Sequence, residues 1–439
     1  MHNDLLIYNG LVWPSADDQP IPDGSVLIQD GRIAKVGRFK ARAKTMIDAD
    51  GCLVMPGLIQ GHIHFCQTLF KGCAEDLQLL PWLKKYIWPL EAAHDPDSLH
   101  ASALLTAAEL IKGGTTAFLS IETVRHTEAV FRAVDQAGLM GAIGHCLMDE
   151  TGGYRPLSVS NEDALAECDV LLDHWGDHAR LKLAVAPRFA LSCSEANMRE
   201  ASGYARDRGL LLHTHASEQV EEVNLVREIT GMDNIDYLNT VGLTGPDVGL
   251  AHCVHTTDAE RALLKESESH VLHCPSANMK LGSGIAPIRE YLDLGIRVAI
   301  GADGAPCNNR LDQLMEMREA GMLQKVRLGA EHGITAQEVV RMATLGGAKL
   351  LGWEQEMGSL TPGKRANLIL VDQSDWPVLP SSDPATNVVY GNCSRDVVMT
   401  MVDGEILYEN GELTRIDEEA LRATVRKQRK LLFERAGIA

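Results

Sequence analysis

Short apolar segments alternate with longer amphipathic segments through the middle of the chain. Eight runs of β-favouring residues between positions 58 and 304 are each followed by a stretch with helical spacing of its apolar residues. This alternation predicts repeated βα units, and eight such units close a (β/α)8 TIM barrel of the α/β class. The predicted strands are Leu58–His64, Thr115–Ile121, Leu139–Leu147, Leu181–Pro187, Leu210–His215, Val248–His252, His270–Cys274 and Arg297–Ala302.

The two ends of the chain have a different pattern. Residues 4–54 and 358–408 hold short β-favouring stretches interrupted by Asp-Gly turns, with no helical pattern between them. Neither end has enough strands for a stable sheet, so we expect the two to pair in one small β-sandwich domain. The expected domains are the sandwich, 1–56 plus 357–415, the barrel, 57–356, and a C-terminal helix, 416–439, whose apolar face packs against the body of the protein.

Composition narrows the possible partners. The 439 residues are 45% hydrophobic and 23% charged, as in globular proteins, and the net charge of −19 disfavours nucleic acid and anionic membranes. No apolar run of about 18 residues occurs, and the N-terminus lacks a signal-peptide pattern. Ten scattered cysteines without a CxxC pair indicate reduced thiols, so we expect a cytoplasmic protein. A homo-oligomer is compatible with the sequence.

Histidines at predicted strand ends indicate a metal site. In the motif GLIQGHIH, His62 and His64 lie two apart and share one strand face, which at the C-terminal end of a barrel strand points into the mouth. His215, His252 and Asp303 come at the ends of other predicted strands. We predict that one divalent metal ion, zinc or alternatively iron, is bound by His62, His64, His215 and Asp303. His252 either binds the metal too or hydrogen-bonds a water held by it.

Other polar residues near these strands have less specific patterns. Glu218 follows His215 by three residues in HASE, where a carboxylate could transfer protons beside the metal, although a glutamate is also ordinary at a helix N-terminus. His213 shares a face with His215 but lies one layer deeper, which favours a core histidine. His255 and His273 come near the barrel mouth, and either a substrate contact or a structural role is open to them.

Longer motifs resemble a known family. PGLIQGHIH, HASE, LAHCVH, HCPSANMKLGSG, GADGAPCNN and GSLTPGKRANLILVD together span nearly the whole chain, and they resemble the amidohydrolase superfamily, in particular its aminohydrolases of purines, adenosine derivatives and triazines. The resemblance implies a metal-dependent barrel with a β-sandwich and hydrolytic chemistry. Asp303 would then accept a proton from the attacking water, His252 would stabilise the developing oxyanion, and Glu218 would protonate a ring nitrogen.

The segment after the first barrel strand resembles one branch of that superfamily. QTLFKGCAEDLQLLPWLKKYIWPLEAAHD is similar to the methylthioadenosine/S-adenosylhomocysteine and 5′-deoxyadenosine deaminases, which implies that Glu91 contacts ribose hydroxyls. Gln67 and the run PRFALS, with Arg188 and Phe189, instead resemble guanine deaminases, in which the glutamine and arginine bind the base. We expect the segment from Asp76 to Glu91, with Trp82 and Trp88, to form a lid. The expected substrate-binding residues are Gln67, Trp88, Glu91, Arg188 and Phe189.

The sequence therefore predicts an aminopurine deaminase, with a small-molecule purine or nucleoside as its partner. The expected substrate is the adenine ring of a 5′-modified adenosine: 5′-deoxyadenosine, methylthioadenosine or S-adenosylhomocysteine. One alternative is a guanine, 8-oxoguanine or pterin deaminase, favoured by Gln67 and Arg188. A second is an s-triazine aminohydrolase or chlorohydrolase, because the same site can expel other leaving groups. A scaffold protein without catalysis is disfavoured, since all candidate ligands and Glu218 are present.

Overall fold

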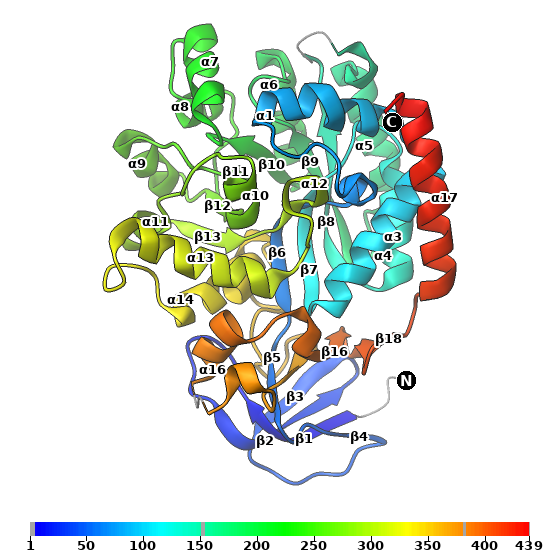
Figure 1. Ribbon diagram of the computed structural model, residues 1–439, viewed down its shortest axis with the longest axis vertical. Helices are drawn as coiled ribbons and strands as arrows, with labels where there is room; N and C mark the ends of the chain where they lie inside the picture. The colour runs from blue at the N-terminus through cyan, green and yellow to red at the C-terminus, as the bar shows by residue number, and fades with distance from the viewer. Residues whose placement is uncertain (1–4, 151–153, 381–382, 439) are drawn as a thin grey trace.

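A parallel barrel forms the centre of the molecule. The computed structural model describes residues 5–150, 154–380 and 383–438 (Figure 1). The barrel strands follow one another around the sheet in chain order, and all eight predicted strands are present with ends that differ by at most two residues. The first seven are β6 (Leu58–His64), β7 (Thr115–Ile121), β8 (Met140–Leu147), β9 (Leu181–Pro187), β10 (Leu211–Ala216), β11 (Val248–His252) and β12 (His270–His273). The eighth is β13 (Arg297–Ile300), which is followed by a short ninth strand, β14 (Asp303–Gly304).

The barrel closes through an interrupted last strand. β13 pairs with β12, and after two residues β14 pairs with β6, where Asp303 lies opposite Ile63 and Gly304 opposite His64. Gly301 lies between the two halves, and a Cβ at this position would collide with the backbone of His62. A glycine is therefore required for the last strand to approach the first. The closure brings Asp303 beside the two histidines of β6.

Helices surround the barrel and bury their apolar faces against it. Several begin at a residue whose side chain accepts a backbone N–H of the first turn, among them Asp95, Ser160 and Ser194. The helices of the barrel are α3 (Pro96–Lys112), α4 (Thr127–Ala137), α5 (Asn161–Trp175), α6 (Glu195–Asp207), α7 (Val220–Thr230), α8 (Asn234–Thr240), α9 (Asp258–Glu266), α10 (Pro275–Lys280), α11 (Ile288–Leu294), α12 (Ala305–Asn308), α13 (Gln313–Leu328), α14 (Ala336–Arg341) and α15 (Gly347–Leu350).

Strands from both ends of the chain share a second sheet, at the bottom of Figure 1. The order is β18-β17-β16-β15-β5-β1-β2-β3, with β4 beside β1, and the two ends meet where β15 pairs antiparallel with β5. This is the small β domain that the sequence predicted. Its strands are β1 (Leu5–Val12), β2 (Ile21–Gln29), β3 (Arg32–Gly37), β4 (Thr45–Asp48), β5 (Cys52–Pro56), β15 (Leu368–Asp372), β16 (Val397–Val402), β17 (Glu405–Glu409) and β18 (Glu412–Leu413). Between β15 and β16 in the chain, α16 (Pro384–Thr386) contacts the barrel helix α14.

A short helical segment after β6 covers the barrel mouth, and the last helix supports it. The segment contains α1 (Leu79–Trp82), a π-helical turn at Leu83–Ile87 and α2 (Trp88–Ala92). The last helix, α17 (Glu418–Ala436), runs along the side of the barrel (Figure 1) and buries Leu432 in one apolar cluster with the segment. Arg429 donates to the carbonyl oxygen of Leu69, and Arg435 donates to that of Ala93. The helix therefore holds the chain on both sides of the covering segment.

Candidate active site

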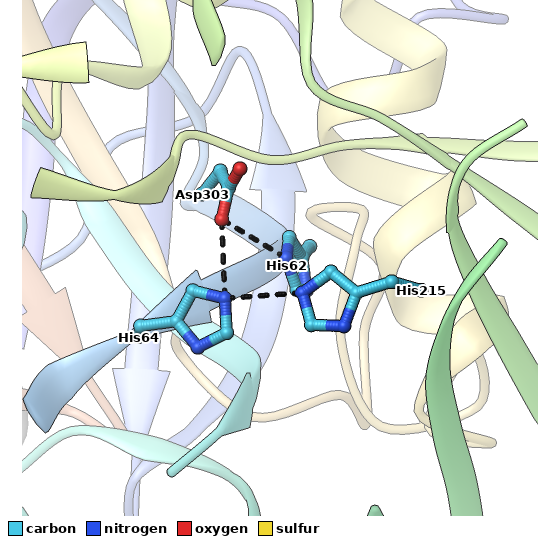
Figure 2. A group of neighbouring side chains, drawn as sticks. All are labelled: His62, His64, His215 and Asp303. Carbon is cyan, nitrogen blue, oxygen red and sulfur yellow. Dashed lines mark hydrogen bonds and ion pairs between the residues drawn. The ribbon is translucent and has the colours of Figure 1, made fainter. Parts of the chain in front are cut away.

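Three histidines and one aspartate converge at the C-terminal ends of the barrel strands (Figure 2). One ligand atom from each of His62, His64, His215 and Asp303 can be chosen so that all four lie within 4.8 Å of one another. Oδ1 of Asp303 lies 3.2 Å from Nε2 of His62 and 3.1 Å from Nε2 of His64. Nε2 of His64 lies 3.3 Å from Nε2 of His215. The structure thus brings together the four residues that the sequence predicted as metal ligands.

The other ring nitrogen of each histidine has a hydrogen-bond partner. Nδ1 of His64 donates to the carbonyl oxygen of Ile121, and Nδ1 of His215 donates to that of Arg188, both at 2.7 Å. These carbonyl oxygens can only accept, so they fix the tautomer of each ring with its lone pair on Nε2. Outer partners of this kind orient the ligands in metal sites.

His62 is oriented by a fourth histidine. Its Nδ1 lies 2.9 Å from Nε2 of His213, whose own Nδ1 lies 3.3 Å from the carbonyl oxygen of Ser120. His213 therefore donates through Nδ1 and accepts from His62 through Nε2. The sequence favoured a core role for His213, and the residue is indeed fully buried, but it contacts a candidate ligand directly. The repeated spacing of HIH and HTH on two strands was the available signal for this contact.

These residues fit a divalent cation. Burial lowers the pKa of His62 to about 4 and that of His215 well below its usual range, so both rings are neutral at neutral pH. With the protons on Nδ1, lone pairs of nitrogen face one another and a carboxylate oxygen, an arrangement that a shared cation stabilises. Ligand atoms bound at about 2.0–2.1 Å in a tetrahedral site lie about 3.3 Å apart. Three of the separations within the group, 3.1, 3.2 and 3.3 Å, match this value, and all four ligand atoms lie within 4.8 Å of one another.

Glu218 and His252 form a proton-holding pair beside this group. Nε2 of His252 lies 3.6 Å from Oε2 of Glu218 and 3.8 Å from Oδ2 of Asp303, while its Nδ1 donates to Asn278. Burial raises the pKa of Glu218 to about 7, and Asp303 adds to the effect. Burial lowers the pKa of His252, but the carboxylates of Glu218 and Asp303 outweigh it and raise that pKa. The pair can therefore hold and exchange protons near neutral pH.

A cavity opens beside the metal-binding residues. It is lined by three of the expected substrate-binding residues, Gln67, Arg188 and Phe189, and by residues of the covering segment, including Leu79, Trp82 and Leu83. Its walls combine apolar side chains with a few convergent polar groups, as in sites for small organic ligands.

The two other expected substrate-binding residues lie behind this wall. Trp88 and Glu91 are each only 2% exposed, and neither is among the described residues that line the cavity. Trp88 packs in the apolar cluster of the covering segment, and Trp82 reaches the cavity instead. Glu91 binds Arg188 through both carboxylate oxygens, at 2.5 and 3.1 Å. In this arrangement neither Trp88 nor Glu91 lines the cavity, so their contacts with a substrate stay predictions.

The fold and the site define the class of protein: a (β/α)8 barrel with a metal-binding centre at the C-terminal ends of its strands. Residues 53–407 match the model of the amidohydrolase family. The chain belongs to the amidohydrolase family. Among the described helices, none combines the length and apolar character needed to cross a membrane.

Individual relatives resemble the chain over nearly its full length. The 5′-deoxyadenosine deaminase of Methanosarcina acetivorans is 36% identical over 99% of both chains. The 5-methylthioadenosine/S-adenosylhomocysteine deaminase of Halobacterium salinarum is 37% identical over 96% of both. A crystal structure of an adenosine deaminase from Xanthomonas campestris with bound zinc is similar with a TM-score of 0.92, at 29% identity over 98% of this chain and 99% of that one.

Proposed function

We propose that this protein hydrolytically deaminates the adenine ring of a 5′-modified adenosine and releases ammonia. The candidate substrates are 5′-deoxyadenosine, methylthioadenosine and S-adenosylhomocysteine, the compounds in the names of its relatives. The observation that carries the proposal is the convergence of His62, His64, His215 and Asp303 beside Glu218, a buried carboxyl group with a pKa of about 7.

The proposed cofactor is a single zinc ion held by His62, His64, His215 and Asp303. Zinc suits a set of three imidazole nitrogens and one carboxylate oxygen, and the adenosine deaminase of similar structure contains it. When bound, such an ion lowers the pKa of water from about 15.7 towards about 7 and so supplies hydroxide at neutral pH.

The residues of the chain then have distinct proton-transfer roles. The water attacks C6 of the adenine ring, and Asp303 accepts its proton on Oδ2, the carboxylate oxygen that faces His252. Nε2 of His252 hydrogen-bonds the oxygen added to C6. Glu218 donates its proton to the ring nitrogen next to C6, which makes that carbon more electrophilic. Proton transfer to the amino group allows the C6–N bond to break, and ammonia leaves as the C6–O bond is retained.

A second candidate function is the deamination of a guanine-type base or a pterin. The observation that favours it is the position of Gln67 and Arg188 in the cavity wall, where both can face the ring of a substrate. The full-length relatives favour the adenosine substrate instead. We also propose a cytoplasmic location, which the ten unpaired cysteines support because free thiols persist in reducing compartments.

Metal analysis combined with an ammonia-release screen tests the proposal. The screen compares 5′-deoxyadenosine, methylthioadenosine, S-adenosylhomocysteine, adenosine, guanine and 8-oxoguanine at equal concentrations. We expect one zinc ion per chain and the highest kcat/KM on a 5′-modified adenosine. Preferred turnover of guanine or 8-oxoguanine would support the second candidate, and a metal-free protein inactive on every compound would reject both.

A further inference from the structure

Gln67 carries a buried hydrogen-bond acceptor that the described residues leave unpaired. Its side-chain nitrogen donates to Oε1 of Glu91 at 2.8 Å, whereas its oxygen Oε1 has no hydrogen-bond partner in residues 5–150, 154–380 and 383–438. The residue is 1% exposed and lines the cavity beside the metal-binding group. An unpaired buried carbonyl oxygen is costly unless a bound molecule satisfies it.

The orientation of this amide follows from its neighbour. A rotated amide would place its oxygen 2.8 Å from a carboxylate oxygen, where two acceptors repel each other, so the nitrogen must face Glu91. Both oxygens of Glu91 accept hydrogen bonds from the guanidinium of Arg188, so this side chain also presents an acceptor, not a donor, to Gln67. The ion pair between Arg188 and Glu91 therefore determines which end of the Gln67 amide points away from it.

The free oxygen lies beside the metal-binding group. A Cβ on residue 304 would collide with Oε1 of Gln67, so this oxygen occupies the space that Gly304 leaves open. Gly304 directly follows Asp303, whose Oδ1 lies 3.1 Å from His64. An acceptor in this place can contact a substituent on the carbon that is attacked.

We propose that Oε1 of Gln67 accepts a hydrogen bond from the amino group that the reaction expels. This inference rests on the proposed deaminase function and deepens it: the site selects substrates that carry an N–H donor on the attacked carbon. Gln67 is then a specificity-determining residue. Glu91 is a positioning residue that acts through Gln67, in place of the ribose contact that the sequence resemblance implies.

A pair of substrates that differ only in the leaving group isolates this hydrogen bond. In 5′-deoxyadenosine the leaving group has N–H donors, and in 6-chloropurine 5′-deoxyriboside it has none. Hydrolysis forms a C6–O bond in both, while either the C6–N bond breaks to release ammonia or the C6–Cl bond breaks to release chloride. Both reactions yield the same nucleoside product, so the kcat/KM ratio of the amino to the chloro substrate measures recognition of the amine.

Two variants change the acceptor by different routes. Gln67→Met removes it, and Glu91→Gln allows the amide of residue 67 to rotate and present a donor. We expect each variant to lower the amino-to-chloro ratio about 10- to 100-fold, the typical cost of a lost or mismatched buried hydrogen bond. Metal content and the urea unfolding midpoint show that each variant is folded and loaded.

The results separate this inference from the function on which it rests. If wild type hydrolyses both nucleosides and both variants lose activity on them equally, Gln67 and Glu91 have only a structural role and the inference is overturned. A wild-type protein inactive on both nucleosides overturns the proposed function and the inference together. A third substrate, 2′,3′-dideoxyadenosine, lacks the ribose diol and tests whether Glu91 contacts it. If wild type hydrolyses this compound more slowly than adenosine, and Glu91→Gln hydrolyses the two at equal rates, Glu91 contacts the diol. That result would contradict the positioning role of Glu91.

Discussion

Nδ1 of His62 lies 2.9 Å from Nε2 of His213, deep in the barrel beneath the metal-binding group. Because Nδ1 of His213 faces the carbonyl oxygen of Ser120, the only acceptor that His213 can offer is Nε2. The proton of His62 is thereby held on Nδ1, and its Nε2 keeps the lone pair that a metal ion needs. A residue outside the ligand set thus determines the tautomer of a ligand.

Replacing His213 should weaken metal binding without removing a ligand. His213→Leu leaves the Nδ1–H of His62 without its acceptor, and the loss of such an outer partner typically costs about 10- to 100-fold in metal affinity. Competition with a chromophoric zinc chelator measures the change. His145→Leu is the matched control, because His145 is a fully buried barrel histidine whose Nδ1 contacts Thr127. Equal losses of affinity in the two variants would contradict the orienting role of His213.

The buried pair of Arg188 and Glu91 should be costly to break from one side. Arg188→Met leaves the Glu91 carboxylate buried without its cation, which destabilises a protein by about 3–5 kcal/mol. Neutralising Glu91 as well, in Arg188→Met/Glu91→Gln, should recover part of this loss. Urea unfolding of wild type and both variants gives the two free energies. If Arg188→Met proved as stable as the double variant, the unpaired Glu91 carboxylate would cost no stability, which would contradict the role of the ion pair.

Glu122 should make stability depend on pH. It accepts the backbone N–H groups of Phe65 and Cys66, directly after His64, and burial raises its pKa from 4.5 to about 8. Between these values the native state keeps a proton that the unfolded chain has released, so the free energy of unfolding falls as pH rises. The contribution of one such group approaches about 1.4 kcal/mol per pH unit.

The variant Glu122→Gln removes this titration and keeps a carbonyl acceptor for one of the two N–H groups. The difference in unfolding free energy between the variant and wild type should therefore shift in favour of the variant from pH 5 to pH 8 and become constant above about pH 9. Urea unfolding at unit pH intervals measures it. A difference that stays constant over the whole range would show that Glu122 is ionised throughout.

The sequence predicted the barrel and the convergence of the four candidate ligands, because both depend on regular spacing. Alternation along a strand places His62 and His64 on one face, and parallel strands bring their C-terminal ends together, so His215 and Asp303 follow from strand positions alone. The interruption between β13 and β14 was not predicted, since it depends on how closely the last strand approaches the first at Gly301.

Contacts between side chains far apart in sequence could not be predicted from the pattern of apolar and polar residues. Glu91 and Arg188 are 97 positions apart, and only the folded chain shows that their charges satisfy each other inside the protein. Likewise, Trp82 and Trp88 occupy one covering segment, and the turn of that segment determines that Trp82 reaches the cavity while Trp88 is buried. His213, which orients the ligand His62, was indicated only by the repeated spacing of HIH and HTH on two strands, and that spacing alone does not show which histidine contacts which.

The central claim is that Glu218 supplies a proton to the substrate beside a metal centre that it does not help to build. Glu218→Gln keeps the shape of the side chain and removes its ability to release a proton. Glu260→Gln is the matched control, because Glu260 is a buried glutamate of α9 that contacts Thr257 and Ile235 and does not line the cavity.

The most direct measurement is kcat for 5′-deoxyadenosine together with metal content in wild type, Glu218→Gln and Glu260→Gln. Loss of a general acid typically lowers the rate about 100- to 10,000-fold. We therefore predict a fall of this size in Glu218→Gln with unchanged metal content, and a near wild-type rate in Glu260→Gln. Turnover by Glu218→Gln at close to the wild-type rate, with the metal bound, would contradict the account.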